Sequence, residues 1–159
     1  MSASTEQPHV LWRDGKSVAV IKPAGLSCER PGHDTASLAS WACRTERVNE
    51  VWLPHRLDRM ARGIVVLALS KSAAAFHAEQ VRERRWEKYY LARIAIDGGG
   101  LRRGWHASGG SEDQVRRLIG EHRAYLRTEG RRARVVRSGG QPSALDILAV
   151  EPAPRGTDD

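Results

Sequence analysis

In this 159-residue sequence, the segment HRLDR at residues 55–59 contains the ionisable side chains that are the best candidates for catalytic chemistry. Asp58 lies between two arginines, shortly before the most apolar stretch of the chain, GIVVLAL at residues 63–69. Nearby cations favour the ionised form, so we expect Asp58 to carry its charge even where it is partly desolvated. An ionised carboxylate in a cleft at the end of a strand suits nucleophilic or base chemistry. The alternative is an ion pair that ties a loop to a sheet.

Other kinds of catalytic and metal sites have no signature in the sequence. The glycine clusters, DGGG among them, lack the spacing of phosphate-binding loops, and no nucleophile elbow of the GxSxG kind is present. His, Cys, Asp and Glu show no zinc-like spacing, and Cys28 and Cys43 are too few for a disulfide framework. We therefore expect free thiols, no metal and no cofactor.

Charge points towards a polyanionic partner. The 26 lysines and arginines exceed the 19 acidic residues, which gives a net charge of +7 and a pI near 10.1. Residues 101–140 contain ten arginines, no lysine and four acids. Arginine matches phosphate oxygens well, although an arginine-rich proteome would produce the same composition without a function. No apolar run approaches the length of a membrane span and residues 1–10 lack a secretory pattern, so we expect a cytoplasmic protein.

The elements that would position HRLDR follow from hydrophobic periodicity and turn signals. Two strands are expected around the turn at residues 13–16, with Val18, Val20 and Lys22 alternating along the second strand. GIVVLALS is apolar on both faces and predicts a strand in the middle of a sheet. The remaining predicted elements are a helix over 36–44 capped by Thr35, a helix over 71–84 capped by Ser72, a helical register over 111–126, and strands over 88–96, 133–137 and 144–151.

The mixture of neighbouring strands, tight turns and helices predicts an α+β fold with a mixed, mostly antiparallel central sheet and flanking helices. One domain is expected over residues 10–151, with a glycine- and arginine-rich part at 97–142. Residues 1–9 are expected to form a disordered tail and residues 152–159 a polar one.

Three motifs in order resemble the RluA-type pseudouridine synthases. They are IKPAG at 21–25, PHRLDRMARGIVVLAL at 54–69 and EKYYLARI at 87–94. The spacing of the first two and the "Q…R" helix before the third also match. The resemblance covers about residues 10–96 and, more loosely, 143–151. It implies an enzyme that isomerises uridine to pseudouridine in RNA without cofactor or metal.

The resemblance also implies roles for individual residues. Asp58 matches the aspartate that attacks the flipped-out uridine, and Tyr90 matches the tyrosine that packs on the base and assists proton removal. Arg56 and Arg59 are expected to position RNA. Two further residues complete the expected RNA-binding set, Lys22, which also shapes the floor of the site beside Pro23, and Arg62.

Without the family motifs, Tyr90 and His55 have simpler structural interpretations. Tyr89 and Tyr90 are adjacent on a predicted strand, so one ring is expected to face inward and the other outward. On periodicity alone, either tyrosine is interpreted simply as a core aromatic. His55 has no catalytic role that we can assign and is expected to make a hydrogen bond that stabilises the loop.

Two departures separate this chain from the family pattern. Ala61-Arg62-Gly63 stands where the family has Thr-Ser-Gly, so two hydroxyls are replaced and a cation is added. The later "TGRxHQIR" motif, whose basic residue pairs with the catalytic aspartate, is absent from the sequence, so the resemblance implies a domain incomplete at its C-terminus.

Three functions therefore compete. The first is a monomeric uridine isomerase acting on ribosomal or transfer RNA, with no DNA or membrane partner. The second is an RNA-binding relative that has lost catalysis, which the missing motif favours. The third is a generic basic domain, which three ordered motifs disfavour.

Overall fold

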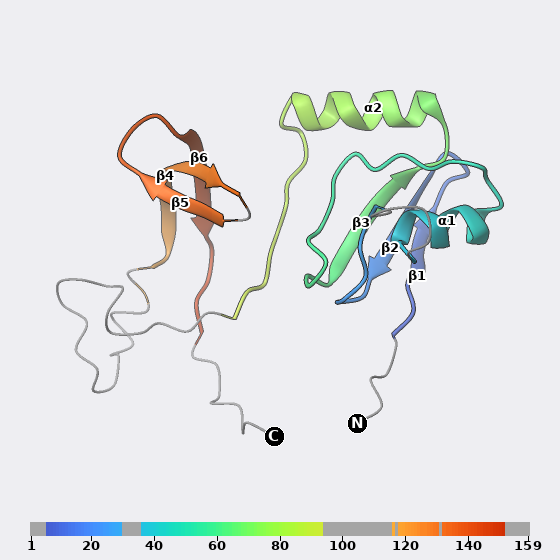
Figure 1. Ribbon diagram of the computed structural model, residues 1–159, viewed down its shortest axis with the longest axis horizontal. Coiled ribbons are helices and arrows are strands. Elements are labelled where there is room, and N and C mark those ends of the chain that lie inside the picture. Colours follow the sequence, from blue (N-terminus) through green and yellow to red (C-terminus); the bar gives the residue numbers. More distant parts are fainter. Residues whose placement is uncertain (1–5, 30–35, 94–115, 117, 131, 152–159) are drawn as a thin grey trace, which may run out of the picture. The chain divides into compact units, whose positions relative to one another are not determined.

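The computed structural model describes residues 6–29, 36–93, 116, 118–130 and 132–151 (Figure 1). The chain divides into two compact units, residues 1–89 and 90–159. Each unit contains one three-stranded antiparallel sheet, and both helices with assigned bounds, α1 and α2, belong to the first unit. The predicted α+β class with antiparallel pairing is confirmed. The predicted single domain over 10–151 stays a prediction.

The first unit begins with a hairpin of β1 (His9–Arg13) and β2 (Ser17–Lys22). The Asp14 carboxylate closes its turn by accepting hydrogen bonds from the backbone N–H groups of Lys16 at 2.8 Å and Ser17 at 2.7 Å. These two bonds lower the pKa of Asp14 below its ordinary value. The predicted hairpin is confirmed, and its sequence signal was this Asp-Gly turn.

The third strand, β3 (Gly63–Ala68), pairs antiparallel with β2 and gives the order β1-β2-β3. Val18 and Val20 pack with Val65 and Leu67 on one face of this sheet, together with Leu38 and Ala42 of α1. Among the described residues β3 is the end strand of this sheet and Ile64 on its other face is 54% exposed, so the central position predicted for GIVVLALS is not found there. An apolar pattern reports side-chain character and does not say how many strands flank the backbone.

The segment before HRLDR covers part of the free edge of β3. Trp52 and Ala68 exchange two backbone hydrogen bonds, of 3.0 and 2.9 Å. Further along the same edge of β3, the imidazole Nε2 of His55 accepts a hydrogen bond from the Val66 backbone N–H at 3.0 Å. A side chain thus takes the place of a neighbouring strand. The loop-stabilising bond predicted for His55 is confirmed.

Both predicted helices of the first unit form, with different caps. The helix α1 (Leu38–Glu46) is capped by Ser37 in a reciprocal arrangement with Ser40. The helix α2 (Lys71–Arg82) is capped by Ser70, whose hydroxyl accepts from the Ala73 N–H, so the predicted Ser72 cap is wrong. The predicted Thr35 cap lies outside the described residues.

The second unit contains β4 (Gly120–Glu129), β5 (Arg132–Val136) and β6 (Gln141–Ile147), in the order β5-β4-β6. Strands were predicted at β5 and over part of β6. The helical register predicted over 111–126 is wrong from residue 120 on, because β4 forms hydrogen-bonded ladders with strands on both sides. Pairing with distant residues overrides a weak local preference.

The strand predicted over 88–96 is not a strand between residues 88 and 93. A strand requires a partner that hydrogen-bonds along its length, and neither described sheet includes these residues. Residues 94–96 lie outside the described part of the chain.

Candidate active site

Asp58 lies on the loop that leads into β3, and its side chain is exposed. Its backbone carbonyl accepts a hydrogen bond from the Ala61 N–H at 3.0 Å, which forms a tight turn. Within the described residues, its carboxylate makes neither a hydrogen bond nor an ion pair. The alternative in which Asp58 serves as a structural ion pair therefore has no support, and the carboxylate remains accessible for chemistry.

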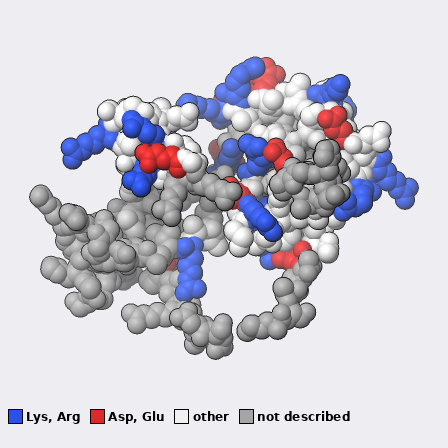
Figure 2. All heavy atoms as spheres, viewed as in Figure 1, with Lys and Arg blue, Asp and Glu red and all other residues white. Residues whose placement is uncertain are grey.

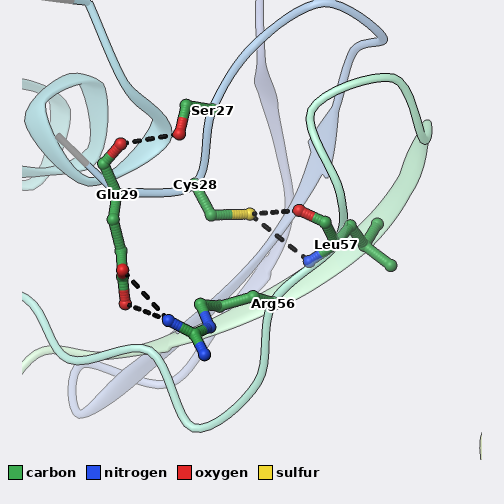
Figure 3. A network of polar contacts seen from close by, with 5 residues as sticks. All are labelled: Ser27, Cys28, Glu29, Arg56 and Leu57. Atoms are coloured by element: carbon green, nitrogen blue, oxygen red, sulfur yellow. Dashed lines mark hydrogen bonds and ion pairs between the residues drawn. The ribbon is translucent and has the colours of Figure 1, made fainter. Parts of the chain in front are cut away.

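The residues on the N-terminal side of Asp58 are fixed to a loop from a distant part of the sequence, as Figure 3 shows. The Arg56 guanidinium donates to both carboxylate oxygens of Glu29, at 3.1 and 3.0 Å. The Cys28 thiol lies against the backbone of Leu57, where it donates to the carbonyl at 3.3 Å and accepts from the N–H at 3.4 Å. These contacts use the groups beside Asp58 and leave its carboxylate out.

Lys22 contacts the Asp58 loop on its C-terminal side, at the Arg59 carbonyl. Its side chain is fully buried, and its ammonium group donates to the carbonyls of Pro23 at 2.9 Å, Leu26 at 2.8 Å and Arg59 at 3.2 Å. The three N–H groups of a lysine thus meet three acceptors. Burial lowers the pKa of Lys22, and the neighbouring Cys28 and Asp58 side chains act in the opposite direction. This enclosure supports the predicted role in shaping the floor rather than a contact with RNA.

A reciprocal pair of bonds joins the same two loops on the C-terminal side. The Gly25 N–H donates to the Arg59 carbonyl at 2.8 Å, and Arg59 Nε donates to the Gly25 carbonyl at 2.8 Å. Gly25 has a φ of 85°, a conformation that favours glycine, as its position after Pro23 indicated. Asp58 is thus an exposed residue of a loop that is held by contacts on both sides of it in the sequence and by Lys22. Such support gives a reacting group the precision it needs.

The exit of the loop depends on a close approach at Gly63. A Cβ atom at this position would lie 3.3 Å from Leu57 Cδ1, and the φ of Gly63 is 152°. Arg62, just before it, forms an ion pair with Glu6 at 2.9 Å. Of the three arginines predicted to contact RNA, Arg56 and Arg62 pair with glutamates and Arg59 holds a backbone carbonyl. Their contacts with RNA stay predictions.

An aromatic cluster supports the His55 end of the loop. The Trp86 ring meets the His55 ring edge-on at a centroid distance of 5.0 Å and the His77 ring at 5.8 Å. Burial lowers the pKa of His55, and the nearby Lys88 and His77 act in the same direction. A neutral His55 is required here because its Nε2 accepts the bond from Val66.

Sequence reasoning did not find Trp86, Cys28 or Glu29. Trp86 carried one usable signal, its place between a helix and the EKYYLA motif. Cys28 and Glu29 lie in a loop without periodicity, and only the fold brings them beside Leu57 and Arg56.

Tyr90 is the first residue of the second unit and is 71% exposed. Its predicted place beside Asp58 stays a prediction. Tyr89 is 73% exposed and donates a hydrogen bond to Glu87 at 3.0 Å. The expected alternation of one inward and one outward ring is absent, because this segment is not in a strand.

Charged side chains on the face drawn in Figure 2 stand in several groups, with acidic atoms beside many basic ones. Arg13, for example, pairs with Glu46 at 3.3 Å and Arg123 pairs with Glu121 at 2.9 Å. The net positive charge is therefore partly neutralised locally. Among the described residues no group of three or more potential metal ligands occurs, and no helix has the length and apolarity to cross a membrane.

Comparison with solved structures identifies the fold. The human protein "RNA Pseudouridylate Synthase Domain Containing 4" superposes with a TM-score of 0.52 at 18% sequence identity, over 85% of this chain and 51% of the human chain. The family model described as RNA pseudouridylate synthase matches residues 16–148. The chain belongs to this family, and the RluA-type resemblance is confirmed.

Curated relatives agree with this assignment. The tRNA pseudouridine synthase C of Haemophilus ducreyi is 32% identical over 112 residues, which cover 69% of this chain and 43% of that protein. The dual-specificity RNA pseudouridine synthase RluA of Salmonella typhi is 36% identical over 86 residues, which cover 54% of this chain and 39% of that protein. The chain thus spans about two fifths of the length of these relatives.

Proposed function

We propose that this chain carries the nucleophile of an RNA pseudouridine synthase and that Asp58 attacks a flipped-out uridine of ribosomal or transfer RNA. The observation that carries the proposal is the free carboxylate of Asp58 on a loop anchored by Lys22, Cys28 and Gly25. Membership of the family supplies the reaction class. The names of two relatives, a tRNA synthase and a dual-specificity RNA synthase, support these RNA classes.

The reaction is an isomerisation and needs no outside atoms or electrons. The bond from N1 of uracil to C1′ of ribose breaks, the base rotates, and a bond from C5 to C1′ forms. The proton on C5 leaves and N1 gains one. A carboxylate is suited to this chemistry as a nucleophile, on the sugar or on the base ring, because it acts in its ionised form. Tyr90 is the proposed aid to proton removal.

A second candidate function has its own observation. Among the described residues no cation forms an ion pair with the Asp58 carboxylate. In this reading the protein binds RNA through its basic surface without turning uridine over.

Mapping pseudouridine in RNA from cells with and without the gene separates the two functions. The proposal expects one or more sites to disappear on deletion and to return with the intact gene, but not with Asp58→Ala. An unchanged map, together with RNA binding by the purified protein, would establish the binding function instead.

A further inference from the structure

The imidazole of His55 joins the start of the Asp58 loop to β3. Its Nε2 atom accepts a hydrogen bond of 3.0 Å from the Val66 N–H, and both residues are partly buried. His55 precedes Asp58 by three residues, so a displacement of its backbone is transmitted to the carboxylate within one short loop. The proposed reaction gives His55 no part.

The other contacts that hold the N-terminal half of this loop are weaker (Figure 3). Arg56 and Glu29 form an ion pair at 3.0 Å, but their side chains are 63% and 55% exposed, and pairs this exposed contribute little to stability. The Cys28 thiol meets the backbone of Leu57 at 3.3 and 3.4 Å, and a thiol is a weak donor and a weak acceptor. The bond to His55 is shorter, partly buried and accepted by an imidazole nitrogen. His55 is therefore the strongest of these three contacts.

Two further rings and one ammonium group surround the imidazole. Trp86, in the segment after α2, meets His55 edge-on at a centroid distance of 5.0 Å, and the His77 ring of α2 meets Trp86 at 5.8 Å. His77 Nε2 and Ser17 Oγ share a hydrogen bond of 2.8 Å, which fixes this second imidazole. Within the described part of the chain, His77 and the Lys88 ammonium are the titratable groups that act on His55, and β3 presents a backbone N–H to it.

The bond between His55 and β3 exists only for the uncharged imidazole. With Nε2 as the acceptor, the neutral ring carries its proton on Nδ1, whereas an imidazolium would turn a second donor towards the Val66 N–H. Burial lowers the pKa of His55, and Lys88 and His77 act in the same direction. The bond is therefore present at neutral pH and is lost as the pH falls through the folded pKa, which lies below the ordinary value of 6.5.

From this geometry we propose that His55 is a positioning residue of the uridine isomerisation, which holds Asp58 in its reacting place through the bond from its neutral imidazole to the Val66 N–H. Asp58 is exposed, and its carboxylate makes no hydrogen bond to a described residue, so its position depends on the backbone of the loop. A displacement of about 1 Å can slow a reaction about a hundredfold. This inference rests on the proposed function, because it concerns the support of the nucleophile proposed there.

The test compares two substitutions that differ in one property, the ability to accept the bond from Val66. His55→Gln places Oε1, an acceptor that does not titrate, close to the position of Nε2. His55→Leu is similar in size and has no acceptor. His9→Leu, at an exposed histidine of β1, is the matched control.

Each full-length protein is incubated with unmodified ribosomal and transfer RNA at several RNA concentrations, between about pH 5 and about pH 8, the range in which histidine titrates. Initial rates of pseudouridine formation are measured by nucleoside mass spectrometry. This design separates kcat from KM. Binding of the same RNA is measured separately, and circular dichroism shows whether each variant is folded.

At neutral pH we expect His55→Leu to lower kcat about ten- to hundredfold with little change in RNA affinity, because the loop loses precision while the RNA contacts remain. His55→Gln should keep most of the activity. As the pH falls, the rate of the unsubstituted protein should drop relative to that of His55→Gln, since only the imidazole loses the bond on protonation. Other titrating groups are common to both proteins and cancel from this ratio. His9→Leu should follow the unsubstituted protein throughout.

A second measurement does not require conversion. Hydrogen exchange of the Val66 amide and of the amides at residues 56–61, followed by NMR at neutral pH, reports how firmly the loop is held. Exchange should be faster in His55→Leu and close to normal in His55→Gln.

An unchanged kcat in His55→Leu would overturn the inference, and so would a ratio of unsubstituted protein to His55→Gln that does not vary with pH. The ratio also decides the matter if His55→Leu does not fold. If none of the proteins converts uridine, the proposed function fails and hydrogen exchange judges the inference separately. Faster exchange in the leucine variant alone would retain His55 as the residue that holds the loop, whereas equal exchange in all variants would reject it.

Discussion

The enclosed ammonium of Lys22 gives the sharpest prediction about how the Asp58 loop is held. Lys22→Met keeps most of the side-chain length and removes the three hydrogen bonds to Pro23, Leu26 and Arg59. The bond to Pro23 is buried, whereas the other two are partly buried. We therefore expect the Pro23 carbonyl to lose its partner fully, the Leu26 carbonyl to take up water and the Arg59 carbonyl to keep its bond from the Gly25 N–H.

The magnitude follows from these environments. A buried carbonyl without a partner costs about 1–3 kcal/mol, and the two partly buried ones add less. Methionine removes the cost of burying a charge, which offsets part of the loss. The net expectation is a decrease of about 2 kcal/mol in the free energy of unfolding, with slower uridine conversion because the Asp58 loop is less well fixed.

Urea denaturation of the full chain, followed by tryptophan fluorescence, measures the first quantity. Lys71→Met, at an exposed lysine of α2, is the matched control and should change stability by less than about 0.5 kcal/mol. If Lys22→Met is as stable as the control, the carbonyl enclosure does not hold the loop and the reasoning fails.

Three further predictions concern the neighbouring structure. Because the pKa of His55 is lowered in the fold, its contribution to stability should be complete above the unfolded value near 6.5 and be lost as the pH falls through the lower folded value; His55→Phe should flatten this pH dependence in denaturation curves. Gly63→Ala should destabilise by about 1–3 kcal/mol, measured by thermal unfolding, since the backbone is unfavourable for alanine and Leu57 is close; an unchanged melting temperature would contradict this contact. Ser70→Ala should cost about 1 kcal/mol and Ser72→Ala much less, and the reverse order would show that the helix begins two residues later.

Local signals predicted the parts of the fold in which neighbours in sequence are also neighbours in space. The Asp14-Gly15 turn located the first hairpin, and alternation predicted that Val18 and Val20 share a buried face. Lys22 continues that alternation and is buried as well, which apolar pattern alone would not suggest for a lysine. Its place in the alternation was predicted from the sequence. The three carbonyl groups that accept hydrogen bonds from its buried ammonium are brought together only by the folded loops.

Strand pairing between segments far apart in the sequence explains where the predicted elements differ from the observed ones. The edge position of β3 depends on which other segments join the sheet, and its own apolar sequence does not contain that information. Likewise β4 is a strand because residues 132–136 and 141–147 pair with it. The segment at 88–93 has strand composition but belongs to neither described sheet.

The candidate site likewise combines features that the sequence predicted with contacts that depend on the fold. HRLDR and IKPAG were found from the sequence, and the fold does bring them together through Lys22, Gly25 and Arg59. An ion pair of Asp58 with a nearby cation was the alternative interpretation of the sequence, beside the expected role of Arg56 and Arg59 in positioning RNA. In the fold, Arg56 pairs instead with Glu29, from a loop 27 residues earlier. Partner choice among charged residues depends on three-dimensional distance, which spacing in the sequence does not give.

The central claim is that Asp58 is the nucleophile. Its most direct test is to incubate the purified full chain with unmodified ribosomal and transfer RNA and to quantify pseudouridine by nucleoside mass spectrometry. The proposed function predicts conversion by the unsubstituted protein and by Glu50→Gln, a change at an exposed carboxylate away from the loop, and none by Asp58→Asn, which should still bind RNA. Conversion by Asp58→Asn, or RNA binding without conversion by the unsubstituted protein, would contradict it.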